Sequence, residues 1–150
     1  MPFVTQIPPS ITALVLYALW AIALVLMILL DRIVLVARGH AKPSDFTGGV
    51  PHGNPGYWRI NRAHMNTVEN LPVFAAIVLA GYAVGQESHL FNLLAMIVFA
   101  ARIVQSLIHI ASGAPTAVNV RFLALGVQLV LEIWMAVLIL QNHPSFHTSF

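Results

Sequence analysis

The feature that most constrains this chain is a long apolar run near its N-terminus. No charged side chain occurs from Ile11 to Leu30. A helix needs about 20 predominantly apolar residues to cross the hydrocarbon core of a bilayer, and this run provides them. The first ten residues contain no Lys or Arg, and the run is too long for the core of a cleavable signal. It predicts a first membrane span over about 11–36, with Ser10 as the helix N-cap.

The composition favours an integral membrane protein. Of the 150 residues, 59% are hydrophobic and only 8% are charged, too few to coat a water-soluble globule, and the mean hydropathy is +0.83. The length predicts a single domain. There is no basic run or aromatic platform, so nothing supports a nucleic-acid partner. The chain lacks cysteine, which excludes disulfides and a thiolate of its own, and the histidines of the first connector show no metal-ligand spacing.

Three further apolar stretches predict helices. They cover about 57–84, 90–111 and 118–140, and short segments rich in glycine, proline and polar residues separate them. The only long connector, 38–56, contains three prolines and two adjacent glycines. Pro72, inside the second stretch, predicts a bend or a loosened hydrogen bond near Val68. The expected fold class is therefore all-α, an integral membrane four-helix bundle.

Each of the last three predicted helices carries a polar stripe. On the second helix the stripe falls within an arc of roughly 100° and consists of Arg59, Arg62, Asn66, Glu69 and Asn70. On the third it consists of Arg102, Gln105, Ser106 and His109, and on the fourth of Arg121, Gln128 and Glu132. Polar groups inside a membrane are costly unless they face partners, water or a ligand.

Two interpretations of these stripes are open. In the first, the acids neutralise the arginines, with Glu69 paired to Arg102 or Arg62 and with Glu132 bonded to a neighbouring helix. In the second, the surplus of positive charge binds an anion, because four arginines face only two acids. For Glu69 and Glu132 taken alone, the structural and functional roles are equally supported.

The basic residues near the span ends predict an orientation. They gather in the first connector and at the start of the fourth span, while the N-terminus, the second connector and the C-terminal tail contain no Lys or Arg. The positive-inside rule then places both termini outside and the arginine-rich end of the bundle in the cytoplasm.

The second span carries a motif with fixed spacing, Arg62-Ala-His-Met-Asn66-x-x-Glu69-Asn70-x-Pro72-x-Phe74. This motif resembles the signature of the MAPEG family, the membrane-associated proteins in eicosanoid and glutathione metabolism. The four-span layout, the long first connector and the arginines of spans 3 and 4 are also similar to that family, so that the resemblance covers nearly the whole chain. The short connectors and Glu69-Asn-Leu-Pro72 look most like its bacterial branch, which implies a bacterial inner membrane.

The resemblance implies a homotrimer that binds glutathione between neighbouring subunits near the cytoplasmic face. The glutathione ligands that it implies are Arg62, His64, Asn66 and Glu69 of span 2 and Arg102 of span 3. Arg59 and Asn70, on the same stripe, are further candidates. His109 stands where several relatives have a tyrosine, and either donates a hydrogen bond to the ligand or packs in the core. His64 lies about 140° from Arg59 around a regular helix, toward a neighbouring subunit or a helix interface.

Arg121 matches the span 4 arginine that is proposed in this family to stabilise the glutathione thiolate. The connector before it is a few residues longer than in the eicosanoid enzymes. The implied function is a membrane-bound transferase or peroxidase that uses glutathione as co-substrate against lipophilic electrophiles or lipid hydroperoxides from the bilayer. The alternative is a non-catalytic scaffold of the same family that binds without turnover. A small-anion carrier fits less well, because no span shows paired breaks at midplane.

Overall fold

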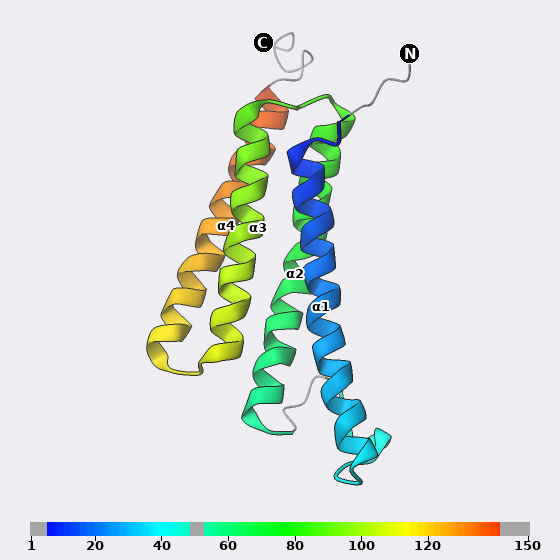
Figure 1. The fold of residues 1–150 in the computed structure, drawn as a ribbon. Coiled ribbons are helices and arrows are strands. Elements are labelled where there is room, and N and C mark those ends of the chain that lie inside the picture. The colour runs from blue at the N-terminus through cyan, green and yellow to red at the C-terminus, as the bar shows by residue number, and fades with distance from the viewer. Residues whose placement is uncertain (1–5, 49–52, 142–150) are drawn as a thin grey trace.

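The computed structural model describes residues 6–48 and 53–141, and over these residues the protein is entirely helical (Figure 1). Its four long helices are α1 (Pro9–Ala37), α2 (Pro55–Ala83), α3 (His89–Ala111) and α4 (Pro115–Gln141). One turn of 3-10 helix, η1 (Pro43–Asp45), lies in the first connector. The predicted all-α four-helix fold is confirmed, and each helix begins and ends within three residues of the predicted range.

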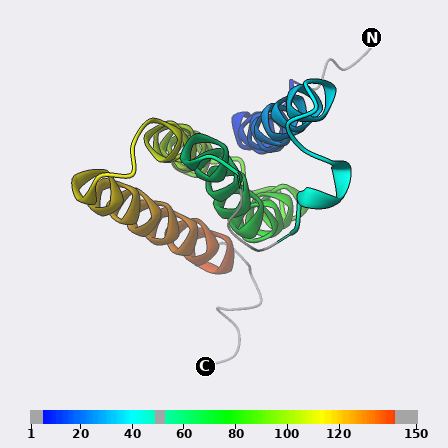
Figure 2. The same ribbon diagram turned by 90° about the horizontal axis from the view of Figure 1, so that it is seen from below.

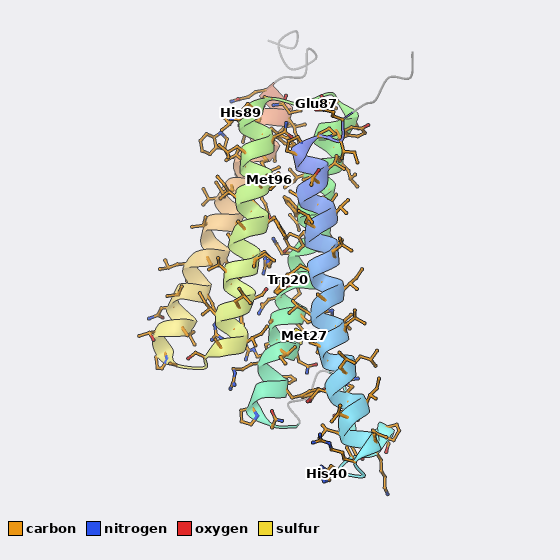
Figure 3. The ribbon with its side chains drawn as sticks, in the orientation of Figure 1. Trp20, Met27, His40, Glu87, His89 and Met96 are labelled. Atoms are coloured by element: carbon orange, nitrogen blue, oxygen red, sulfur yellow. The ribbon has the colours of Figure 1, made fainter. Side chains whose placement is uncertain are left out.

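Three of the four helices, α1, α3 and α4, are long and apolar enough to cross a membrane. α2 is as long as α1, but its N-terminal half carries the charged stripe, which lowers its hydropathy. Figure 3 shows Glu87 and His89 at one end of the bundle and His40 at the other, with Trp20, Met27 and Met96 between them. Glu87, His89 and His40 thus mark the two ends of the membrane-spanning helices.

The start of α1 differs from the prediction. The helix begins at Pro9 with Pro8 as its N-cap, so Ser10 lies inside the first turn, where it is buried. Its backbone N–H donates to Oδ1 of Asn92 in α3 at 3.0 Å. A proline is well tolerated in the first helical turn, and a side chain from another helix supplies the missing acceptor. The prediction that Ser10 is the N-cap was therefore wrong.

The C-terminal ends of α1 and α2 share one hydrogen-bonding pattern. Gly39 and Gly85 follow the last helical turns with φ of 70° and 71°, in the left-handed region. The backbone N–H of the next residue then reaches back, from His40 to the carbonyl of Leu35 at 2.9 Å and from Gln86 to that of Gly81 at 2.8 Å. These Schellman-type ends satisfy carbonyls that the helix leaves free.

The helices pack around a small apolar core. Its buried members come from all four helices and include Tyr17, Phe74, Phe91, Val98 and Met135. The rings of Tyr17 and Phe74 lie with their centroids 5.3 Å apart. Seen along the helices in Figure 2, α4 lies on the side of the bundle away from α1, against α3 and α2. α4 therefore presents a broad apolar surface, on which Phe122 is 75% exposed, as expected for a face in contact with lipid or another subunit.

Candidate functional site

The polar stripes converge at one end of the bundle, the lower end in Figure 1. There α2 begins, α3 ends and α4 begins. The N-terminal start of α2 is fixed by Asn54, whose side-chain oxygen accepts from the backbone N–H of Tyr57 at 2.8 Å. Arg59, one turn further, donates through Nε to the carbonyl of Ile110 at 2.9 Å and so caps the last turn of α3.

The imidazole of His109 on α3 contacts side chains of both α2 and α4. Its Nε2 lies 3.0 Å from Nδ2 of Asn66 on α2, and its Nδ1 lies 2.9 Å from NH1 of Arg121 on α4. A guanidinium can only donate hydrogen bonds, so Nδ1 of His109 accepts from Arg121. His109 is only 7% exposed and contacts protein through both ring nitrogens.

Arg102 lies deeper in the bundle and points inward. It is 1% exposed, and its NH1 donates to the carbonyl of Asn66 at 3.1 Å and to Oε1 of Gln105 at 2.7 Å. Its guanidinium carbon lies 5.7 Å from the ring centroid of Tyr17. Its Nε and NH2 are buried, and neither has a hydrogen-bond partner among residues 6–48 and 53–141. In a single subunit, therefore, Arg102 contacts the other helices and not the surface.

Two glutamines, which the sequence placed on the stripes but not in the site, connect the arginines. Gln105 Nε2 donates to the carbonyl of Arg121 at 2.9 Å, and its Oε1 accepts from Nε2 of Gln128 at 3.1 Å. Gln128 is fully buried and also donates to the carbonyl of Ala124 at 2.8 Å. Their helical spacing, which put them on the same faces as Arg102 and Arg121, was the signal in the sequence.

The acids of the stripes lie in different surroundings. Glu132 is 2% exposed, and its Oε1 accepts from Nδ2 of Asn70 at 2.7 Å, which is the bond to a neighbouring helix that the first interpretation requires. Glu69 is exposed on α2. Within the described part of the chain, it forms no ion pair with Arg62 or Arg102. Glu132 is thus engaged in helix packing, while Glu69 is available to a ligand.

A polar groove runs along the outer face of α2. Its volume is about 230 Å³, and it is lined by Trp58, Arg62, Met65, Asn66 and Glu69. The groove brings together three of the four predicted span 2 ligands. The fourth, His64, is half-buried and does not line it. Arg121 is also outside the groove, and its NH1 additionally donates to the carbonyl of Ser112 at 3.4 Å.

The arrangement offers both signs of charge to one ligand. Arg62 presents a fork of donors that suits a carboxylate, and Glu69 accepts from an ammonium group. Asn66 connects this groove to the buried centre, because its side chain donates to the carbonyl of Arg62 at 2.9 Å and also contacts His109. Asn66 therefore lines the groove and also lies against the ring that contacts Arg121.

Comparison with known proteins agrees with this architecture. A family model described as the MAPEG family matches residues 11–141. A search of curated proteins found no match. Because the matched region covers nearly the whole chain, the protein belongs to the MAPEG family, whose members are glutathione transferases or peroxidases, or enzymes of eicosanoid synthesis.

Proposed function

We propose that this protein is a glutathione-dependent transferase or peroxidase that acts on lipophilic electrophiles or lipid hydroperoxides. Membership of the MAPEG family supports glutathione as the co-substrate. The single observation that carries the proposal is the polar groove on α2, in which Arg62 and Glu69 present opposite charges beside Asn66. Glutathione carries two carboxylates and one ammonium group, so this pairing of charges suits its backbone.

Arg121 is the residue that we assign to the thiol. A thiol with a pKa near 8.5 is mostly protonated at neutral pH, and only the thiolate is a nucleophile. Lowering that pKa by about two units requires roughly 2.7 kcal/mol of preferential thiolate stabilisation. A nearby guanidinium in a partly dry site provides stabilisation of this kind. His109 would hold Arg121 in place by accepting from its NH1.

The chemistry then needs no further reagent from the protein. In a transferase step, the thiol proton leaves to solvent, the sulfur forms a bond to the electrophilic carbon, and the leaving group departs with the electron pair of its bond. In a peroxidase cycle, two glutathione molecules are oxidised to the disulfide, and the hydroperoxide is reduced to an alcohol and water. The lipophilic substrate would arrive through the bilayer.

We further propose that the working unit is a homotrimer. The groove lies on an exposed face of α2, and Arg121 does not line it. A neighbouring subunit would supply the second wall and enclose glutathione between the two chains. The cytoplasm is the expected side for this end of the bundle, since Arg32, Arg38 and Lys42 lie at the same end as Arg59 and Arg62.

Two alanine substitutions test this function. Arg62→Ala should raise the KM for glutathione, and Arg121→Ala should lower kcat, with both variants retaining the oligomeric state of the wild type. Lys42→Ala, which removes an exposed positive charge from the connector, is the matched control and should leave both constants unchanged. Unchanged activity in both Arg62→Ala and Arg121→Ala would overturn the assignment.

A binding scaffold without turnover is the second candidate. The observation that favours it is the inward position of two predicted ligands, because Arg102 and His109 are buried and engaged by protein groups. Such a protein would bind glutathione with an unshifted thiol. Turnover of several electrophiles by the purified protein would exclude it.

A further inference from the structure

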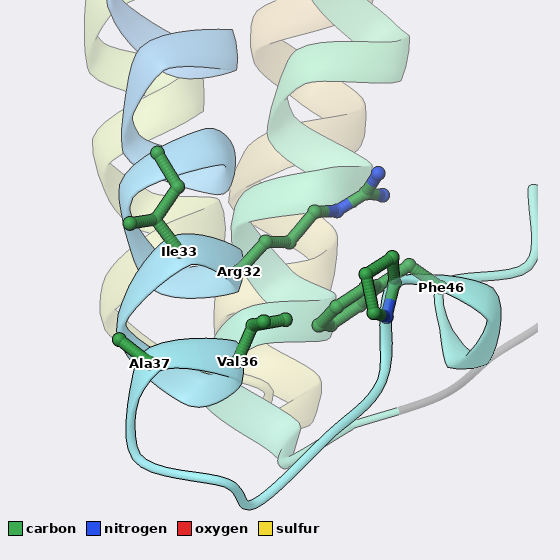
Figure 4. Close-up of a pocket in the computed structure, with 6 residues that line it drawn as sticks. Arg32, Ile33, Val36, Ala37 and Phe46 are labelled. Atoms are coloured by element: carbon green, nitrogen blue, oxygen red, sulfur yellow. The ribbon is translucent and has the colours of Figure 1, made fainter.

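A second groove lies at the C-terminal end of α1, at the same end of the bundle as the polar stripe of α2 but lined by other residues. Its volume is about 470 Å³, and its lining residues come from the last turns of α1 and from the connector that folds back against them: Arg32, Ile33, Val36, Ala37, Pro43 and Phe46 (Figure 4). Five of these six side chains are apolar. The groove therefore has apolar walls, and Arg32 is the only charged side chain that lines it.

The position of Arg32 along α1 places this cation at the level of lipid phosphates. At 1.5 Å per residue, Arg32 lies about 35 Å from Pro9 along the helix. The hydrocarbon core of a bilayer is about 30 Å thick. Since α1 is long and apolar enough to span the membrane, Arg32 lies just beyond the hydrocarbon, where the headgroups begin.

The guanidinium of Arg32 is fixed by its neighbours. Its Nε donates to the hydroxyl of Tyr57 at 2.7 Å, and its central carbon lies 5.2 Å from the ring centroid of Phe46 and 5.8 Å from that of Tyr57. NH1 and NH2 have no protein partner among the residues that the structure describes. A planar fork held by aromatic contacts with both terminal nitrogens available suits a phosphate.

We propose that this groove binds an anionic phospholipid, with one acyl chain along its apolar walls and the phosphate on NH1 and NH2 of Arg32. The local charge supports an anionic headgroup. Arg38 and Lys42 are exposed beside the groove, and the two nearby acids are turned elsewhere: Asp45 accepts from the backbone N–H of Lys42 at 2.8 Å, and Oδ2 of Asp31 is buried. Basic residues next to a membrane helix favour anionic lipid in this way.

The apolar walls distinguish a lipid from a soluble anion. Ile33 is 53% exposed, and Pro43 and Ala37 are exposed with it, so that free phosphate on Arg32 would leave them uncovered. An acyl chain covers them and adds affinity in proportion to the area it buries. This site is independent of the proposed glutathione chemistry, because none of its lining residues belongs to the groove on α2.

The test is native mass spectrometry of the full chain, purified in detergent and incubated with equal amounts of phosphatidylglycerol and phosphatidylcholine. The wild type should retain one phosphatidylglycerol in preference to phosphatidylcholine, and inorganic phosphate should not displace it. Arg32→Gln should weaken retention about tenfold, the effect of losing one charge-assisted contact. Arg38→Gln removes the same charge six residues away, outside the groove, and should weaken retention much less than Arg32→Gln does.

A second variant covers the possibility that Arg32→Gln fails to fold, since it also removes the bond to Tyr57. Ala37→Trp leaves all charges in place and fills the groove from an exposed position, so it should reduce lipid retention as well. Equal loss in Arg32→Gln and Arg38→Gln would overturn the proposal in favour of diffuse electrostatic attraction. Displacement of the lipid by inorganic phosphate, or full retention in Ala37→Trp, would also overturn it.

Discussion

NH1 of Arg121 donates to Nδ1 of His109 at 2.9 Å, joining the start of α4 to the end of α3. The same ring contacts Asn66 on α2, so one imidazole sets the positions of three helices around the proposed thiol site. His109 is the acceptor in this bond, because a guanidinium cannot accept a hydrogen bond. In the mechanism that we propose, His109 is a positioning residue that acts through Arg121.

Replacing His109 tests that role. His109→Phe keeps a ring of similar size but removes the acceptor, so Arg121 loses its orientation, and we expect kcat/KM to fall about tenfold, the effect of one hydrogen bond to a charged group. His109→Gln retains an acceptor and should recover part of the activity. Equal activity of His109→Phe and the wild type in steady-state kinetics would show that the bond has no catalytic consequence.

The bond between Asn70 and Glu132 should stabilise the fold. Glu132→Ala leaves Nδ2 of Asn70 without its partner and removes a carboxylate from the surroundings of buried Arg102, which should lower the free energy of unfolding by about 3 kcal/mol. Glu132→Gln keeps the acceptor and should lower the free energy of unfolding by less than half as much as Glu132→Ala. Denaturation in mixed micelles measures both values, and equal effects of the two variants would contradict the role of this bond.

Gly81 allows α2 and α3 to approach closely. A Cβ at this position would lie 2.5 Å from Cζ of Phe91, a fully buried ring. Gly81→Ala should therefore destabilise the protein by about 1–3 kcal/mol, as overpacked cores do. Phe91→Leu in the same chain should restore part of the loss. Gly126→Ala in α4 is the control, since a Cβ there would have open space within 4 Å and the substitution should be neutral or stabilising.

Arg59 and Arg62 belong to one stripe but should behave differently. Arg59 caps α3 through Ile110, so Arg59→Gln should lower the Tm and leave the Kd for glutathione within about twofold, because a cap contributes about 1 kcal/mol to stability. Arg62 is exposed in the groove. Arg62→Gln should therefore raise the Kd for glutathione and leave the Tm unchanged. Isothermal titration and thermal unfolding of both variants separate the two roles. A loss of affinity in Arg59→Gln would return Arg59 to the ligand set.

The helices were predictable because each contains an apolar run, carries its polar residues at helical spacing and is bounded by proline, glycine or polar residues. Burial in lipid leaves the backbone of such runs no other stable conformation. The start of α1 was not predictable in this way, because the acceptor for the backbone N–H of Ser10 is the side chain of Asn92 on another helix. Local sequence does not contain that contact.

The site was predictable to the level of helix faces. Helical spacing placed Arg62, Asn66 and Glu69 on one face of α2, and these three residues line one groove, whereas Arg59 and Asn70 of the same stripe do not. Spacing within a helix does not give the rotation of one helix against another, which decides that Arg102 points inward and that Asn70 meets Glu132. The role of Gln105 as the connection between Arg102 and Arg121 likewise depends on packing between helices.

The most direct test is a titration of glutathione bound to the detergent-purified protein, followed by the ultraviolet absorbance of its thiolate. We predict that the bound thiol ionises about two units below the ordinary thiol pKa of about 8.5, so that the thiolate is present at neutral pH and disappears only in acid. Arg121→Ala should bind glutathione and return the pKa toward the ordinary value. Bound glutathione with an unshifted thiol in the wild type would contradict the proposed mechanism and favour a binding scaffold.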